Sequence, residues 1–221
     1  MNEKTNNLNF PRTELLETGL SLLGNNKIKI LEGMTKSGKS WILKELYLKI
    51  RRDRPQINCL FIQAGDKKMS HIKTGLDLEK ETDNLGTGLA AIFVDDIQKI
   101  SDFENSLYHL AFNKNLDIYI SFEGNFLLST PKVLLNKLEN LYSIIQIHPL
   151  PYKEFFNQSK EQSWKKVEQY FELGGLPFLN RFTNKEDCKE YLETVCKTFG
   201  VTRPSYDVKK VRNPEILVKV L

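Results

Sequence analysis

The sequence has few of the residues that build disulfide frameworks and metal clusters. Its 221 residues include three cysteines and three histidines. The cysteines are an odd number and none stands in a Cys-x-x-Cys pair, which argues against a disulfide framework and against a zinc site. The scattered histidines indicate no metal cluster. This composition is typical of a chain that stays reduced, and we expect a cytoplasmic protein.

Long apolar runs and a strong charge of one sign are lacking too. No run approaches the length of a membrane span, and the Asn-rich, polar first residues lack the apolar core of a signal peptide. The net charge of +4 is too small to indicate a dedicated nucleic-acid coat, although it leaves room for a local basic patch. With 40% hydrophobic and 27% charged residues, the chain is expected to be globular and soluble, with one large domain or one domain and a small appendage.

One glycine-rich stretch, residues 33–40, fits the phosphate-binding pattern G-x-x-x-x-G-K-[ST] at every fixed position. Glycines let backbone N–H groups turn toward phosphate oxygens. We expect Lys39 to reach the β- and γ-phosphates and the Ser40 hydroxyl to bind Mg²⁺. The predicted nucleotide-binding residues are Gly33, Met34, Thr35, Lys36, Ser37, Gly38, Lys39, Ser40 and Trp41.

The flanking sequence favours phosphate binding over the alternative, an accidental match in a Gly/Ser/Lys turn. Residues 27–32 alternate polar and apolar side chains as a strand does, and they lead directly into Gly33. Residues 41–50 carry apolar side chains at helical spacing, with no helix breaker before Pro55. The N-terminus of that helix would lie beside the phosphates, where its dipole favours anions.

The run Ala-Ile-Phe-Val-Asp-Asp at residues 91–96 is a second chemical landmark. Its apolar residues predict a strand buried on both faces, as in a parallel sheet flanked by helices. Such sheets bind ligands at the carboxyl ends of their strands. Beside a phosphate loop, the run predicts that Asp95 joins the Mg²⁺ shell and that Asp96 orients or deprotonates the attacking water. Taken alone, it could equally be a strand that meets a solvated turn.

The remaining periodicity predicts an α/β P-loop NTPase fold, in which helices flank a five-stranded, mainly parallel sheet and form a C-terminal helical subdomain. Further strands are expected at 57–62, 117–122 and 142–147, helices at 13–23, 76–89, 101–113 and 127–138, and a loop at 63–75. After residue 147 the pattern is purely helical, over 152–157, 163–173 and 185–199.

Several segments resemble one family, the prokaryotic AAA-like P-loop ATPases whose ATPase domain precedes a winged helix and a nuclease-like domain. Residues 92–99 resemble its LFLDEIQ segment, 148–155 its PLSFKEF segment, 170–177 its YL..GGLP segment and 211–217 its I.NPELL segment. The likeness runs from about residue 15 to the end. The phosphate loop is generic to P-loop proteins, whereas the Pro-Leu and Gly-Gly-Leu-Pro segments are specific to the family.

The resemblance implies an AAA-like division of the chain. We expect a flexible tail at 1–12, the ATPase core at 13–150, the helical subdomain at 151–205 and the start of a truncated winged-helix-like region at 206–221. In AAA-type ATPases a polar residue after the fourth strand senses the γ-phosphate. Ser121, Glu123 and Asn125 are the candidates, beside an ordinary strand-to-helix turn. Ser121 alone matches the family's Thr-Gly-Ser-Ser segment directly, and it joins Lys39 and Asp96 as a predicted catalytic residue.

Departures from the family's pattern bear on catalysis. Asp96 stands where the family usually has Glu, so its side chain is one methylene shorter. Residues 139–141 read Glu-Asn-Leu where a Gly-Arg usually precedes the fifth strand, and no nuclease-like domain follows within the 221 residues. A cation at the γ-phosphate is worth about three to five orders of magnitude in rate in other P-loop systems. Nucleotide binding is therefore better supported than fast hydrolysis.

The sequence predicts an ATP-binding, Mg²⁺-dependent ATPase that hydrolyses ATP to ADP and phosphate through positioning and charge neutralisation. One alternative is a nucleotide-gated interaction module that binds ATP with little or no hydrolysis, and another is a small-molecule kinase. ATP is favoured over GTP because no Asn/Thr-Lys-x-Asp motif is visible. Besides ATP, we expect a protein partner or a second copy at the C-terminal helical region. DNA at the basic residues 49–54 is the weaker expectation, and no membrane partner is expected.

Overall fold

The computed structural model of the chain describes residues 12–157, 164–182 and 184–198. The chain divides between Asn180 and Arg181 into two compact units. The sheet and the helices around it belong to the first unit, and α9 (Lys185–Thr198) belongs to the second. Residues 1–11 of the predicted tail and the predicted winged-helix-like region at 206–221 lie outside the described residues. The predicted domain boundaries stay predictions.

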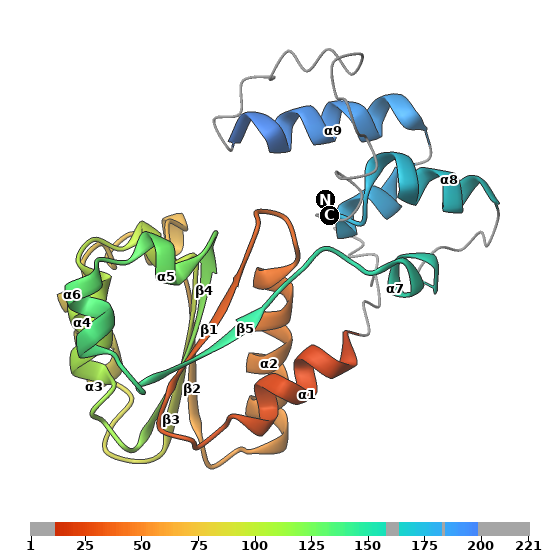
Figure 1. Ribbon diagram of the computed structural model, residues 1–221. Helices are drawn as coiled ribbons and strands as arrows, with labels where there is room; N and C mark the ends of the chain where they lie inside the picture. The colour runs from red at the N-terminus through yellow and green to blue at the C-terminus, as the bar shows by residue number, and fades with distance from the viewer. Residues whose placement is uncertain (1–11, 158–163, 183, 199–221) are drawn as a thin grey trace. The chain divides into compact units, whose positions relative to one another are not determined.

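A five-stranded, entirely parallel sheet organises the first unit (Figure 1). The strand order is β2-β3-β4-β1-β5. The strands are β1 (Ile28–Gly33), β2 (Asn58–Gln63), β3 (Ala90–Asp95), β4 (Leu116–Glu123) and β5 (Tyr142–Gln146). The predicted five-stranded α/β fold is confirmed. Because all strands run the same way, their carboxyl ends share one edge, where β1 lies between β4 and β5.

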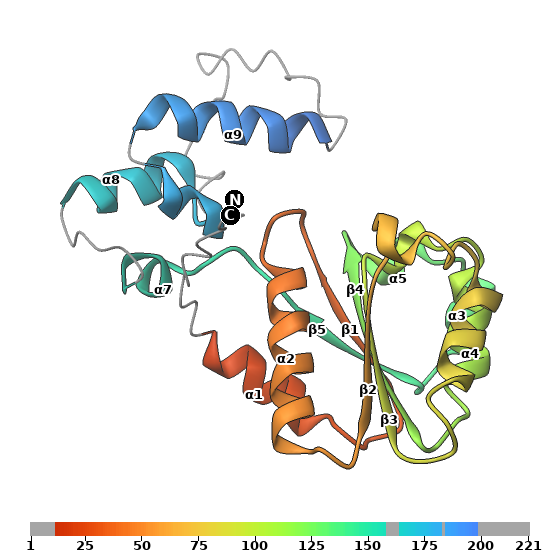
Figure 2. The ribbon, with the colours of Figure 1, turned by 180° about the vertical axis from the view of Figure 1, so that it is seen from behind.

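Helices cover both faces of this sheet (Figure 2). One face carries α1 (Thr13–Ser21) and α2 (Lys39–Asp53); the other carries α3 (Gly75–Asp83), α4 (Phe103–Leu110), α5 (Phe126–Ser129) and α6 (Lys132–Lys137). Along β3, Ile92 and Val94 join the core beneath α3–α6, and Ala91 and Phe93 join the core beneath α1 and α2. Both faces of β3 are therefore buried, as its apolar run predicted.

The chain after β5 is helical in its described residues. It forms α7 (Tyr152–Asn157), α8 (Trp164–Leu173), the 3₁₀ helix η3 (Pro177–Arg181) and α9. The helices predicted over 152–157, 163–173 and 185–199 are confirmed where the structure describes them. Within the described ranges, no helix combines the length and the apolar character that a bilayer span requires.

The helices predicted at 76–89 and 101–113 have different ends. The Thr74 side chain and Asp77 form a capping box, so α3 begins at Gly75, and it ends at Asp83 before the glycine-containing turn. The Ser101 N–H donates to the carbonyl of Lys73 over 2.8 Å, so Ser101 forms an isolated β-bridge instead of the first turn of a helix. The helix α4 therefore begins at Phe103. The predicted loop at 63–75 also contains a short 3₁₀ helix, η1 (Lys67–Met69).

The single helix predicted at 127–138 is wrong, because Pro131 divides it. Asn125 caps α5, which ends at Ser129, and α6 begins at Lys132. Proline has no backbone N–H, and Pro131 has an extended backbone with ψ of 136°. The proline therefore starts the second helix instead of continuing the first.

Candidate functional site

The loop between β1 and α2 has a backbone that depends on its two fixed glycines. Gly38 has a φ of 105°, in the left-handed region that L-residues rarely adopt. A Cβ on Gly33 would lie 2.2 Å from the carbonyl oxygen of Ile147, so no larger residue fits there. Lys36 also has a positive φ, of 60°. These successive turns of the backbone are typical of an anion-binding loop.

Lys39, the first residue of α2, extends back into this loop. Its side chain is buried, and Nζ donates to the carbonyl oxygens of Gly33 and Met34 over 2.9 and 2.8 Å. Burial lowers the pKa of Lys39, whereas the carboxylates at the ends of β3 and β4 act to raise it. The ammonium therefore lies inside the loop, where the predicted phosphate contact requires it.

The helix α2 and the strand β3 bring the two predicted Mg²⁺ ligands together. The Ser40 side chain lies near the buried carboxylate of Asp95, the last residue of β3, and acts to lower its pKa. Burial is the main cause that raises the pKa of Asp95, and the hydrogen bond from Ser121 and the Ser40 side chain act against it. Hydroxyl and carboxylate oxygens are the hard ligands that Mg²⁺ prefers.

This small ligand set fits Mg²⁺ better than a metal held by protein alone. Across the described residues there is no group of three or more His, Cys, Asp or Glu that could hold a metal ion. Mg²⁺ is usually held by one or two carboxylates together with phosphate oxygens and waters. Ser40 and Asp95 lie beside the loop that carries Lys39, which is where phosphates would complete such a shell.

Ser121 of β4 connects the two aspartates that end β3. Its fully buried Oγ donates to Asp95 Oδ1 over 2.5 Å and accepts from the Asp96 N–H over 2.7 Å. Asp96 has a left-handed backbone, with φ of 54°, which turns the chain directly after the strand. Ser121 therefore holds the carboxylate of Asp95 and the backbone of Asp96, and its predicted contact with the γ-phosphate stays a prediction.

The other two sensor candidates have different surroundings. Asn125 Oδ1 accepts from the Leu128 N–H over 3.0 Å and so caps α5. Glu123 pairs with Gly33 in the sheet register, and its charge is the largest of those that raise the pKa of Lys39. Glu123 thus adds a carboxylate to the edge of the sheet where the loop begins.

The other residues of the predicted phosphate loop differ in how far they are buried. Met34 and Lys36 are exposed, Thr35 is buried, and Trp41 packs partly against the core beneath α1 and α2. Ser37 is fully buried, and its Oγ has no hydrogen-bond partner among the residues that the structure describes. A buried hydroxyl without a partner is costly, which fits a loop built to contact a polar ligand.

Lys99 is a functional candidate that the sequence analysis missed. It ends the 3₁₀ helix η2 (Ile97–Lys99), and its Nζ lies 2.7 Å from Asp96 Oδ2. This hydrogen bond is the main cause that raises the pKa of Lys99. Its place three residues after Asp96 was the available signal, because side chains at this spacing meet on a helical turn.

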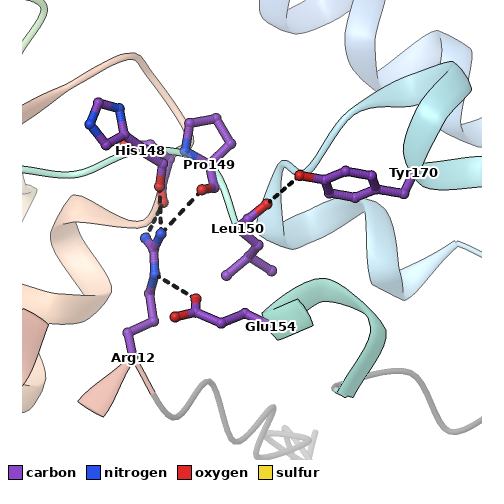
Figure 3. A network of polar contacts seen from close by, with 7 residues as sticks. Arg12, His148, Pro149, Leu150, Glu154 and Tyr170 are labelled. Atoms are coloured by element: carbon purple, nitrogen blue, oxygen red, sulfur yellow. Dashed lines mark hydrogen bonds and ion pairs between the residues drawn. The ribbon is translucent and has the colours of Figure 1, made fainter. Parts of the chain in front are cut away.

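Arg12, the last residue of the predicted tail at 1–12, contacts both the phosphate loop and the segment after β5. Its side chain is 4% exposed and donates from Nη1 to the Ser37 carbonyl over 3.0 Å. Nη2 donates to the carbonyls of His148 and Pro149 over 2.6 and 3.3 Å, and Nε pairs with Glu154 over 3.3 Å (Figure 3). Burial lowers the pKa of Arg12, but these acceptors compensate the cost of desolvating the guanidinium. Nothing in the local sequence signals this convergence.

The two segments that carry the family-specific resemblance contact each other. The Leu150 N–H donates to the Gly175 carbonyl over 2.7 Å, and the Tyr170 hydroxyl donates to the Leu150 carbonyl over 3.2 Å (Figure 3). A Cβ on Gly175 would lie 2.2 Å from that same carbonyl oxygen. The Pro-Leu and Gly-Gly-Leu-Pro segments therefore form one packed unit.

Comparison with known proteins identifies the family and a solved structure of similar fold. A family model described as AAA domain matches residues 25–156, more than half of the chain. An uncharacterized protein of Methanocaldococcus jannaschii is 25% identical over 89% of this chain and 46% of its own length, so the chain spans less than half of that relative. The AMPPCP-bound DnaA of Aquifex aeolicus has a similar fold, with a TM-score of 0.52 and 14% identity over 85% of this chain and 60% of that one. Cdc6p of Pyrobaculum aerophilum has a TM-score of 0.49 and 13% identity over 66% of this chain and 48% of that one.

Proposed function

This chain belongs to the AAA domain family of P-loop ATPases, and from this premise we propose that it binds ATP with Mg²⁺ and hydrolyses it to ADP and phosphate. The observation that carries the proposal is the meeting of Lys39, Ser40 and Asp95 at the carboxyl edge of the sheet. Residues from β1, α2 and β3 are needed to assemble this set, so a chance match of the loop sequence does not account for it.

The phosphate-binding roles follow from the positions of the side chains. Lys39 would exchange its contacts with the Gly33 and Met34 carbonyls for β- and γ-phosphate oxygens. Ser40 and Asp95 would hold Mg²⁺. When bound, the ion would neutralise part of the charge that develops on the phosphates.

Hydrolysis would depend on Asp96, which Ser121 holds at the end of β3. The Asp96 carboxylate would accept a hydrogen bond from water and orient its oxygen toward the γ-phosphorus. The new bond joins that oxygen to phosphorus, and the bond from phosphorus to the bridging oxygen breaks, so that ADP leaves with the bridging oxygen. The water proton passes to Asp96 or to the phosphate product.

Release of phosphate from ATP in the presence of Mg²⁺ tests this proposal. Asp96→Asn is expected to keep ATP affinity and to lose about 10²-fold or more in turnover, because the amide cannot act as a base. Asp102→Asn is the matched control, since Asp102 also has a left-handed backbone but is exposed at the start of α4. Turnover that Asp96→Asn leaves unchanged would refute the role of Asp96, and a wild type that binds no ATP would refute the proposal as a whole.

A second candidate function is a nucleotide-gated interaction module that hydrolyses ATP slowly or not at all. The Arg12 contacts favour it, because they join the Ser37 carbonyl in the phosphate loop to Pro149 and to Glu154 of α7. A change of loop shape on nucleotide binding would therefore act directly on the segment before the helical region. Binding of ATP without measurable phosphate release would identify this function.

The partner in either case is proposed to bind at the C-terminal helical region. On α8, Trp164 and Phe171 are each 79% exposed, and exposed aromatic side chains are enriched at protein interfaces. DNA binding at the end of α2 has less support, because Lys49 and Arg52 both pair with Asp53.

A further inference from the structure

Two lysines lie among the same carboxylates at the edge of the sheet. Asp95, Asp96 and Glu123 interact electrostatically with Lys39 and also with Lys99. Lys39 is buried in the phosphate loop, whereas the Lys99 side chain is 52% exposed. The site therefore contains a second cation, on the outer side of the cluster, that the phosphate-binding pattern does not include.

The position of Lys99 is set by two loops at the carboxyl edge of the sheet. Its backbone lies in η2, the turn that directly follows β3. Its Cδ would lie 3.3 Å from a Cβ built on Gly65, in the loop after β2, so the stem of the side chain passes against that glycine. Its Nζ contacts Asp96 Oδ2, on the residue assigned to the attacking water. The ammonium thus lies beside the carboxylate to which the attacking water is assigned.

We propose that Lys99 contacts the γ-phosphate of bound ATP and supplies the positive charge that the sequence lacks at residues 139–141. In this assignment Nζ exchanges the Asp96 carboxylate for a γ-phosphate oxygen, which leaves Asp96 free to hold the water. The inference rests on the proposed function, because it requires ATP in the loop between β1 and α2.

The exchange is favourable on general grounds. An ion pair near the surface contributes little to stability, so little is lost when the half-exposed Lys99 leaves Asp96. The γ-phosphate carries more negative charge than one carboxylate, and the charge develops further during the reaction. The flexible four-carbon stem of lysine allows Nζ to move between the two acceptors without a change in the backbone.

The test compares the affinities of wild type and Lys99→Met for ATP and for ADP, both with Mg²⁺. A hydrogen bond to a charged group corresponds to about tenfold or more in affinity, so Lys99→Met should bind ATP about tenfold more weakly and ADP unchanged. Turnover at saturating ATP should fall as well, and Lys99→Arg should restore both the preference for ATP and the turnover. Lys49→Met is the matched control, because Lys49 pairs with Asp53 over 3.4 Å at the other end of α2.

The outcomes separate this inference from the function on which it rests. Equal losses for ATP and ADP, no loss for either, or a rise in turnover in Lys99→Met would overturn the role of Lys99 while the nucleotide site stands. If the wild type binds neither nucleotide, the proposed function fails and the assignment of Lys99 fails with it.

Discussion

The Arg12 guanidinium donates from Nη1 to the carbonyl oxygen of Ser37 over 3.0 Å. Ser37 lies in the phosphate loop, and Arg12 precedes the first helix of the fold. The same guanidinium holds the carbonyls of His148 and Pro149, which follow β5. The Arg12 side chain therefore connects the phosphate loop to the segment that follows β5.

Replacing Arg12 with alanine should lower both stability and nucleotide affinity. The substitution leaves the buried Ser37 carbonyl and the partly buried carbonyls of His148 and Pro149 without this donor, so we expect the free energy of unfolding to fall by about 2–4 kcal/mol. Denaturant unfolding and titration with Mg–ATP measure the two effects. Arg52→Ala, at an exposed arginine of α2 paired with its neighbour Asp53, should change stability by less than about 0.5 kcal/mol. Equal stabilities of the two variants would contradict the structural role of Arg12.

Gly33→Ala should weaken ATP binding because the new methyl group requires the loop and the chain after β5 to move apart. Its Cβ would lie 2.2 Å from the Ile147 carbonyl oxygen, which is backbone and cannot rotate away. Gly88→Ala is the control, since a Cβ there meets nothing within 4 Å. Thermal unfolding together with ATP titration should show a loss in Gly33→Ala alone. The account of the loop is wrong if Gly33→Ala binds ATP as the wild type does.

Ser121→Ala should separate turnover from nucleotide binding. The substitution removes the acceptor of the Asp96 N–H and the donor to Asp95, at a cost of about 1–3 kcal/mol in stability. We expect slower phosphate release because Asp96 loses its fixed direction, while Lys39 still holds the phosphates. Single-turnover kinetics at saturating ATP measure this step. An unchanged rate would show that the direction of Asp96 does not depend on Ser121.

The capping box of α3 predicts a pH dependence of stability. Hydrogen bonds from Thr74 and Lys73 lower the pKa of Asp77 in the folded chain. An acid with a lowered folded pKa stabilises the fold above its ordinary pKa of about 4, and this contribution is lost as the pH falls through the folded value. Wild type should therefore exceed Asp77→Asn in unfolding free energy at pH 7, and the difference should shrink as the pH falls below about 4. A difference that is constant with pH would contradict this assignment.

Local patterns were enough to predict most of the fold. Every predicted strand begins and ends within one residue of the observed strand, because alternation and apolar runs record burial directly. The prediction of one helix at 127–138 was wrong because the apolar pattern continues across Pro131 and hides the break at the proline. The structure instead ends one helix before the proline and begins another after it.

In the candidate site, too, contiguous motifs were predicted and residues outside such motifs were missed. The phosphate loop and the Asp95-Asp96 pair were predicted because each is a short, contiguous pattern with a known chemical requirement. Lys99 was missed because its only signal in the sequence is its spacing of three residues from Asp96, which many surface lysines share with a carboxylate. Arg12 was missed because its acceptors come from residues 37, 148, 149 and 154, which only the fold brings together.

Calorimetric titration with ATP, in the presence of Mg²⁺ and again with EDTA, tests the central claim most directly. Wild type should bind ATP, and binding should weaken when EDTA removes the ion, because Ser40 and Asp95 then have no metal to share with the phosphates. Lys39→Ala should lose about tenfold or more in affinity, whereas Lys44→Ala, at an exposed lysine of the same helix, should bind as wild type does. Equal binding by all three proteins, or no binding by the wild type, would contradict the assignment of this loop as a Mg–ATP site.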